Sequence, residues 1–270
     1  MKNERQRENV SRLFPLLEAA YERYNRKEFV SPDPLEFVYR YERPEDREVV
    51  GLIASCIAYG RVTQILRSVE VVLKVLGASP AEFLKSAPQE DLLLTLRSFR
   101  HRFTSGEEMV RLLGGIGSVL RRWGSLECFL GHNLQASSHR LEGVSLFVEG
   151  IREAGKIPSS FLLASPRDGS ACKRLFLFLK WMVRSDEVDP GEWSVLSPRD
   201  LVVPLDVHMF RICSALGLTQ RRTPDLRTAR EITTVFSHIL PDDPVKYDFV
   251  LTRFGIRPEL NEREFIDSCQ

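Results

Sequence analysis

The sequence predicts an all-α protein. Apolar residues recur at helical spacing along nearly the whole chain, and no convincing run alternates apolar and polar residues as a strand would. Proline and glycine clusters divide this pattern into segments of helical length. The 270 residues, 43% of them apolar, are enough to bury a sizeable core in one large domain or in two packed lobes.

Breaks in the pattern delimit the helices expected in the first half of the chain. The prolines at 32 and 34 end the first helix before them, because proline disfavours helix in the residue that precedes it. Gly60 separates the second helix from the third, and the polar stretch 131–140 is predicted to be a loop. The expected helices span about 4–26, 44–59, 62–77, 80–86, 89–96, 106–122 and 141–154.

Three apolar stripes in the second half are typical of helices that face a core. They lie within 171–184, 209–216 and 247–254, and glycines at 217 and 255 are expected to stop the last two. Their members follow the i, i+3, i+4, i+7 spacing: Leu175, Phe178, Leu179 and Met182; Met209, Ile212, Cys213 and Leu216; Tyr247, Val250, Leu251 and Phe254.

The overall charge balance does not indicate a polyanionic partner. The chain has 38 Lys and Arg against 37 Asp and Glu, which counts against a large nucleic-acid footprint but permits a local basic patch. The first seven residues are too polar for a signal peptide, and no apolar run approaches the length of a membrane span. We therefore expect a cytoplasmic protein without a membrane partner.

The cysteines predict neither a disulfide framework nor a metal site. Five of them are scattered along the chain without zinc-ligand or redox-motif spacing, so we expect buried thiols. Asp206 and His208 could suggest a metal pair, but residues i and i+2 of a helix point about 200° apart. We expect no metal and no cofactor. The cysteines are Cys56, Cys128, Cys172, Cys213 and Cys269.

Asp206 is the first candidate for chemistry. Pro204 favours an extended approach, which places Asp206 at the N-cap of the following helix. A carboxylate there accepts hydrogen bonds from free backbone amides and lies at the positive end of the helix dipole. The alternative is that Asp206 is a helix cap and nothing more.

Lys173 is the second candidate. The polar, turn-prone stretch 164–172 opens the helix that carries the first stripe, and free amides there, with Lys173 and Arg174, are suited to a phosphate. Lys180 lies seven residues further on nearly the same face, about 10 Å along the axis. The alternative is an ordinary solvated basic face.

Residues 204–212, followed by Leu-Gly-Leu at 216–218, resemble a segment of the endonuclease-three-like DNA glycosylases. That family's segment reads V-D-T-H-V-x-R-V…R-L-G, and its aspartate is catalytic, so the resemblance implies this role for Asp206. The helix ending at Phe254-Gly255 is similar to the one that follows in that family. The sequence has no loop of four cysteines of the kind that binds an iron–sulfur cluster, so we expect no such cluster.

Upstream, the resemblance is closest to the archaeal 8-oxoguanine glycosylase branch. Bifunctional members carry a catalytic lysine after an L-P-G-V-G-x-K-T-A hairpin; here 165–169 keeps the proline and the second glycine, and Arg167 replaces the first. Lys173 comes 33 residues before Asp206, and residues 173–182 are similar to the K-T-L-x-F-x-x-K-M helix of that branch. The resemblance implies that Lys173 is the catalytic lysine and ranks Lys180 second for that role.

Near the front, residues 57–64 are similar to the L-S-A-Q-A-T-D turn that helps such enzymes wedge the duplex. Tyr59, Arg61 and Gln64 are then expected to supply stacking and polar contacts. The alternative is a helix–helix turn with an anchored tyrosine. The whole chain also resembles a bacterial family of unknown function, through its Ala-Tyr-Gly-Arg, Leu-Lys-Trp-Met-Val-Arg and Asp-Pro-Val-Lys-Tyr-Asp-Phe elements.

Together these resemblances imply a two-lobed, DNA-glycosylase-like helical fold with a central cleft. The lobes are expected at 45–185 and at 1–44 with 186–270. The implied function is excision of a flipped damaged base from double-stranded DNA, alone or followed by strand cleavage. A non-catalytic nucleic-acid binder, and a helical protein acting on a small ligand or protein partner, remain open. The expected nucleic-acid contacts are Arg167, Gly169, Ser170, Arg174, Lys180, Tyr59, Arg61 and Gln64.

Overall fold

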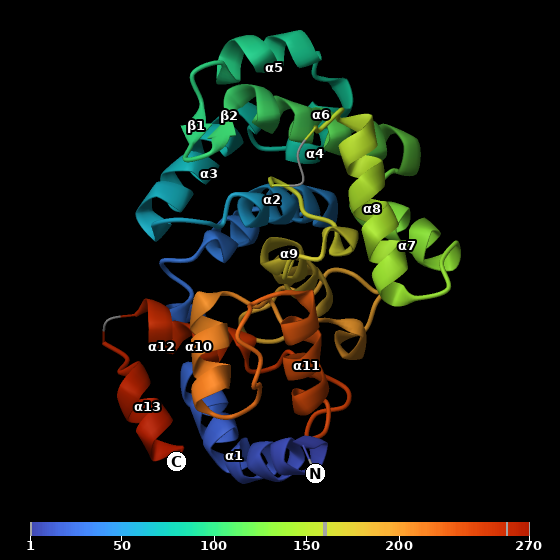
Figure 1. Cartoon of the computed structure of the whole chain (residues 1–270). Coiled ribbons are helices and arrows are strands. Elements are labelled where there is room, and N and C mark those ends of the chain that lie inside the picture. The colour runs from blue at the N-terminus through green and yellow to red at the C-terminus, as the bar shows by residue number, and fades with distance from the viewer. Residues whose placement is uncertain (1, 159–160, 258, 270) are drawn as a thin grey trace. The chain divides into compact units, whose positions relative to one another are not determined.

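The computed structural model describes residues 2–158, 161–257 and 259–269 (Figure 1). Nearly all regular structure in these ranges is helical, so the all-α prediction is confirmed. The strands in this part of the chain are β1 (Arg100–His101) and β2 (Thr104–Ser105), which form one short hairpin. No helix within the same ranges combines the length and apolar character needed to cross a lipid bilayer.

The chain divides into two compact units, each made of separate segments. Unit 1 contains Met1–Phe29, Gly169–Gly191 and Leu196–Gln270, and unit 2 contains Val30–Asp168 and Glu192–Val195. This division differs from the lobes expected from the sequence, which placed 30–44 with the termini and 173–183 in the middle lobe. The helix at 173–183 belongs to unit 1 because its buried lysine forms ion pairs with aspartates of that unit.

Unit 2 is built around a long helix, α6, that packs against α4, α5, α7 and α8 (Figure 1). The core face of α6 carries Met109, Leu112, Leu113, Ile116 and Leu120, all buried at helical spacing. Its α-helices are α2 (Pro44–Cys56), α3 (Val62–Leu76), α4 (Pro80–Ser86), α5 (Gln89–Leu96), α6 (Gly106–Trp123), α7 (Leu126–Gln135) and α8 (Arg140–Ala154), with 3-10 helices at Pro34–Arg40 and Pro166–Asp168.

Glycines let α6 approach its neighbours closely. A Cβ added at Gly115 would lie 2.4 Å from the carbonyl oxygen of Ile151 on α8, and one at Gly117 would lie 2.4 Å from that of Leu84 on α4. Real Cβ atoms do not come this near to a backbone oxygen, so any side chain at either position would push helices apart. These two positions set the spacing of the unit 2 core.

Two buried carboxylates on α2 hold the starts of other elements of unit 2. Asp46 accepts a hydrogen bond from the amide of Ala81 at 2.8 Å, at the beginning of α4. Glu48 accepts from the amides of Leu126 and Glu127, at the beginning of α7, and from the indole Nε1 of Trp193 at 3.1 Å. Burial raises the pKa of Glu48 to about 7 although these donors favour its charged form.

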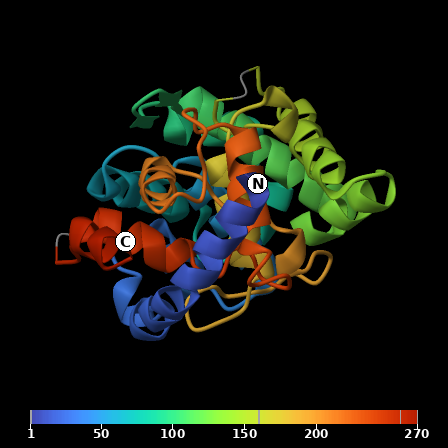
Figure 2. The same cartoon turned by 60° about the horizontal axis from the view of Figure 1, so that its bottom comes forward.

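Unit 1 gathers both ends of the chain around α9 and α10. Figures 1 and 2 show α10 beside α12, and an added Cβ at Gly255 of α12 would lie 2.2 Å from Nδ1 of His208 on α10. Its α-helices are α1 (Lys2–Tyr24), α9 (Lys173–Val183), α10 (Val207–Ala215), α11 (Leu226–Phe236), α12 (Asp248–Ile256) and α13 (Glu262–Ser268), with 3-10 helices at Lys27–Phe29 and Pro198–Asp200. His208 thus packs against a helix of its own unit.

Three helices depart from the sequence expectations. The prediction of a loop at 131–140 is wrong, because α7 continues to Gln135. Ser125 caps this helix through the amide of Cys128, and Gly131 lies against Val195 instead of breaking it. Helices α11 and α13 were not expected, because their charged residues leave only short apolar stripes.

Candidate functional site

The start of α9 is fixed by a turn with two residues in the left-handed region. Gly169 has φ +75° and Cys172 has φ 46°. Between them, Ser170 forms a β-bridge with Asp225, the residue that caps α11. Helix α9 then begins at Lys173, so the lysine predicted to be catalytic occupies its first turn.

Asp206 caps α10, as the sequence predicts. Its carboxylate accepts a hydrogen bond from the amide of Met209 at 2.8 Å. The approach to the cap is held by α11, where the hydroxyl of Thr233 accepts a hydrogen bond from the amide of Val203 at 3.0 Å. One carboxylate oxygen therefore serves the helix, and the other is available for a second contact.

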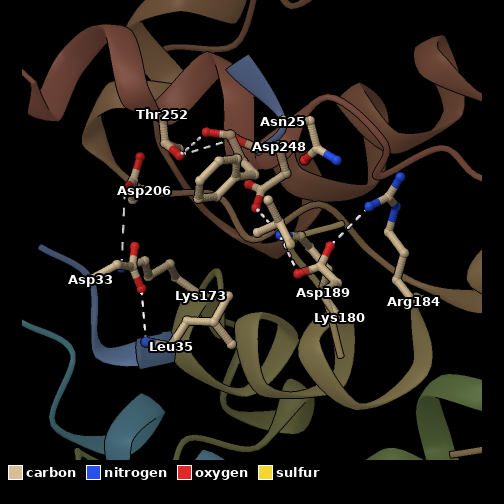
Figure 3. A network of polar contacts seen from close by, with 12 residues as sticks. Asn25, Asp33, Leu35, Lys173, Lys180, Arg184, Asp189, Asp206, Asp248 and Thr252 are labelled. Atoms are coloured by element: carbon tan, nitrogen blue, oxygen red, sulfur yellow. Dashed lines mark hydrogen bonds and ion pairs between the residues drawn. The ribbon is translucent and has the colours of Figure 1, made fainter. Parts of the chain in front are cut away.

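The structure brings Lys173 and Asp206 together. The Nζ of Lys173 lies 4.0 Å from Oδ2 of Asp206, and the two side chains are 29% and 16% exposed (Figure 3). Both groups come from the first turns of helices in unit 1, although 33 residues separate them in sequence. The arrangement places an amine and a carboxylate where both can reach one small electrophilic centre, and where solvent still has access.

Lys180, on the same helix, lies in a different setting. Its side chain is 1% exposed, and its Nζ lies 3.1 Å from Asp189 and 3.2 Å from Asp248 (Figure 3). Burial opposes the charged ammonium, but the two carboxylates outweigh it and raise the pKa of Lys180. The expectation that Lys180 contacts nucleic acid is corrected, because a buried amine between two carboxylates cannot reach a phosphate.

Arg184 extends this buried cluster by one turn of α9. Its guanidinium pairs with Asp189 at 3.0 Å, with Asp243 at 2.8 Å and with Asp186. Asp186 also accepts hydrogen bonds from the hydroxyl of Tyr21 and from the side-chain amide of Asn25, each at 2.7 Å. The cluster ties α1 to α9, which makes it part of the framework of unit 1.

Asp248 has one ionic partner in this cluster. It is the first residue of α12 and is 4% exposed; its Oδ2 meets Lys180, whereas its buried Oδ1 has no hydrogen-bond partner among the described residues. Burial raises the pKa of Asp248 to about 6; Lys180 lowers it, and the charge of Asp206 adds to the rise. Asp248 is therefore electrostatically coupled to Asp206.

The turn before α9 offers less to a phosphate than the sequence suggested. Arg167 is half exposed, but its guanidinium is paired with Glu149 at 2.6 Å and with Glu142 at 3.7 Å, both on α8. Gly169 and Ser170 are exposed, and Arg174 is partly exposed. A phosphate at Arg167 would have to displace two carboxylates.

The predicted contacts near the front of the chain divide into an anchor and two exposed groups. The hydroxyl of Tyr59 donates to the carbonyl of His101 at 2.8 Å and contacts the hydroxyl of Thr104 at 2.7 Å. Tyr59 therefore fastens the β1–β2 hairpin to the turn before α3. Arg61, the N-cap residue of α3, and Gln64, one turn later, are exposed.

Comparison with protein families gives one match. A family model described as "Protein of unknown function (DUF2400)" matches residues 33–257. The chain belongs to the DUF2400 family. The search of curated proteins and the search of solved structures each found no match.

The DUF2400 match spans both members of the Lys173–Asp206 pair and the residues that bury Lys180. Among the described residues of this DUF2400 protein, no group of three or more His, Cys, Asp and Glu is placed to hold a metal ion. Its five cysteines are free thiols, and four of them are buried.

Sequence reasoning missed the acidic partners of Lys180 in this DUF2400 chain. The signal was present, because Lys180 is a lone charge after the apolar run Leu175–Leu179 and before Trp181-Met182-Val183. A charge embedded in such a run has no polar face of the helix to occupy, so it needs a buried counter-ion. Asp189 and Asp248 supply it, from 9 and 68 residues further along the chain.

Proposed function

We propose that this protein is a DNA glycosylase that excises a damaged base, with lyase activity supplied by Lys173. The observation that carries the proposal is the 4.0 Å separation of Lys173 Nζ and Asp206 Oδ2, at the first turns of two helices. The resemblance of 173–182 and 204–212 to the glycosylase segments supports the same pair of roles. The partner is double-stranded DNA, and the expected place of action is the cytoplasm.

Asp206 acts on the charge that develops as the base leaves. A base inside the stack is out of reach, so the target nucleotide must first be flipped from the duplex. As the bond between C1′ and the base nitrogen stretches, positive charge builds on the sugar. A fixed carboxylate stabilises that charge, the more so because its helix cap already holds it in place.

Lys173 supplies the nucleophile. The unprotonated amine forms a bond to C1′, the glycosidic bond breaks, and the base departs with its electron pair and takes up a proton. The sugar ring then opens to a protonated imine between C1′ and Nζ, whose α-proton can be removed so that the 3′ phosphate is eliminated. Asp206 lies near enough to Nζ to stabilise the positive imine.

Two substitutions at the pair test the proposal. Asp206→Asn keeps the cap, since asparagine caps helices as well as aspartate does, but removes the negative charge. We expect base release from duplexes carrying uracil, 8-oxoguanine or alkylated purines to fall about 10²–10³-fold with DNA affinity retained. Asp242→Asn, which removes an exposed carboxylate of the same unit, is the matched control and should release base normally.

Borohydride trapping tests the lysine separately. The wild-type protein should give a covalent adduct with duplex containing an abasic site, and Lys173→Gln should give none. Lys85→Gln, at a lysine of unit 2 that is 28% exposed, should trap as the wild type does. The proposal is wrong if the wild-type protein neither traps nor releases any of these bases.

One observation favours a second candidate, a nucleic-acid binder without chemistry. Arg167 replaces a glycine of the glycosylase hairpin and is paired with Glu149 and Glu142, which weakens the grip on a phosphate next to Lys173. Such a protein would bind DNA with an affinity that falls linearly on a log–log plot against salt, and Asp206→Asn would change no product. Binding with that salt dependence and no base release would favour this candidate.

A further inference from the structure

The tip of the β1–β2 hairpin presents an arginine and a phenylalanine. The register pairs Arg100 with Ser105 and His101 with Thr104, which leaves Arg102 and Phe103 as a two-residue loop. Arg102 has φ 51°, a left-handed conformation that glycine adopts more readily. Phe103 is 68% exposed. The loop thus carries a large charged side chain where the backbone favours glycine, followed by a large exposed aromatic side chain.

The base of this hairpin is rigid. His101 is fully buried; its Nδ1 is hydrogen-bonded to the hydroxyl of Ser68 on α3 at 2.8 Å, and its Nε2 to the carbonyl of Tyr59 at 3.0 Å. The hydroxyl of Tyr59 returns a hydrogen bond to the carbonyl of His101. Phe103 is therefore displayed from a fixed platform, so little conformational entropy is lost when a ligand packs on it.

Phe103 is one of a row of aromatic rings. Its ring meets Phe161 edge to face, with centroids 5.7 Å apart, and Phe161 meets Tyr59 in the same way at 5.1 Å. Phe161 is 40% exposed. The row supports Phe103 from one side and leaves most of its surface open to solvent.

The charges around this row are positive. The Arg102 guanidinium lies 5.5 Å from the Phe103 ring centroid, and its side chain runs across Gly60, next to the exposed Arg61. Glu107 and Glu108, just after the hairpin, are engaged with Arg111 and with the cap of α6. Within the described ranges, five exposed arginines of this region have no carboxylate partner: Arg61, Arg67, Arg97, Arg100 and Arg102.

We propose that this surface, the Phe103 platform, binds single-stranded nucleic acid. An unpaired base stacks on Phe103, and arginines beside it bind the neighbouring phosphates. A second copy of the chain is disfavoured as the occupant, because it would bring the same positive charges to the contact. The inference deepens the proposed function and rests on it only for the choice of DNA as the probe.

Binding of a fluorescent oligo-dT of about 12 nucleotides, followed by anisotropy, tests the platform. Phe103→Ala removes the stacking surface without touching the core, and we expect Kd to rise about 5- to 150-fold, the range for one stacked base. Leu94→Ala, at a leucine of unit 2 that is 69% exposed, should bind as the wild type does.

Two further arms separate stacking from charge. On an oligonucleotide of the same length made of tetrahydrofuran units, which lack a base and cannot form an imine with Lys173, wild type and Phe103→Ala should bind equally. Arg102→Gln should lower the slope of log affinity against log salt by about 0.7 on the normal oligonucleotide, the contribution of one phosphate contact. Arg263→Gln, at an exposed arginine of unit 1, should leave that slope unchanged.

The platform is refuted if Phe103→Ala binds oligo-dT as tightly as the wild type. It is equally refuted if polyaspartate displaces the oligonucleotide as well as unlabelled DNA does, because the surface would then be a general polyanion site. Asp206→Asn should bind oligo-dT normally, since that residue is not part of the platform. If Asp206→Asn loses base release while Phe103→Ala binds oligo-dT normally, the platform proposal is wrong and the glycosylase proposal stands. If Asp206→Asn keeps base release while Phe103→Ala binds oligo-dT weakly, the glycosylase proposal is wrong and the platform proposal stands.

Discussion

Two lysines on one helix show how surroundings decide what an ammonium group can do. Lys173, in the first turn of α9, is 29% exposed and lies 4.0 Å from one carboxylate. Lys180, two turns later, is 1% exposed and lies between two carboxylates at 3.1 and 3.2 Å. The buried amine is locked as a cation by its partners, whereas the exposed one keeps access to solvent and to a substrate.

This difference separates a framework role from a reactive one. An ion pair taken out of water has a large desolvation cost, which only close partners on both sides offset. Such a pair tolerates neither loss of a partner nor displacement by a ligand. A partly exposed pair at helix starts has a smaller desolvation cost, so its members can exchange partners during a reaction.

The largest effect is expected for substitution of the buried lysine, Lys180. Lys180→Met fills the same space but leaves Asp248 without its cation and Asp189 with Arg184 alone, and we expect the free energy of unfolding to fall by about 3–5 kcal/mol. Lys173→Met, the matched change on the same helix, should lower it by less than about 1 kcal/mol. Urea unfolding followed by circular dichroism measures the free energy of unfolding of both variants. Equal losses would show that the two lysines do not differ in their contribution to stability.

An intermediate effect concerns pH. Because burial raises the pKa of Asp248 from 3.8 to about 6, its contribution to stability is fully present below about pH 3.8 and is lost as the pH rises through about 6. The loss should be on the order of 3 kcal/mol. Asparagine stays neutral, as Asp248 does at low pH. Urea midpoints of wild type and Asp248→Asn, measured between pH 4 and 7, should therefore lie closest near pH 4 and separate as the pH rises, with the wild type becoming the less stable of the two. Parallel curves would show that Asp248 does not titrate in this range.

The smallest effect on the free energy of unfolding is expected for Asp206, the N-cap residue of α10. Asp206→Ala removes the hydrogen bond to the amide of Met209, and we expect a loss of about 1 kcal/mol in unfolding free energy. Asp206→Asn should lose only a few tenths of this, because the amide oxygen still accepts the bond. A larger loss in the asparagine variant would assign the negative charge of Asp206 to folding and not to chemistry.

The sequence predicted the local features of this site well. Helical periodicity and Pro204 placed the start of α10 at Asp206, and the structure confirms that cap. The turn-prone stretch before Lys173 likewise marked the start of α9. These features depend on residues that are neighbours along the chain, so a single sequence contains the information. The DNA glycosylase activity itself stays a prediction.

What the sequence could not give depends on distant partners. The burial of Lys180 follows from Asp189 and Asp248, and only the folded chain shows that α12 brings Asp248 to α9. The ion pairs of Arg167 with two carboxylates of α8 could not be predicted for the same reason, because the partners are distant in sequence. Helix α7 was missed because Gly131 suggests a break in sequence, whereas in the structure it makes room for Val195.

The short return of the chain at Glu192–Val195 limits how the protein can be cut. The polypeptide passes between the units at 29/30, 168/169, 191/192 and 195/196, so neither unit is a continuous stretch of sequence. A fragment covering 30–168 would lack Trp193 and leave the buried Glu48 without one of its three donors. A cut between 168 and 169 would therefore leave a polar defect in the interior of unit 2, so a fragment meant to contain that unit has to extend to residue 195.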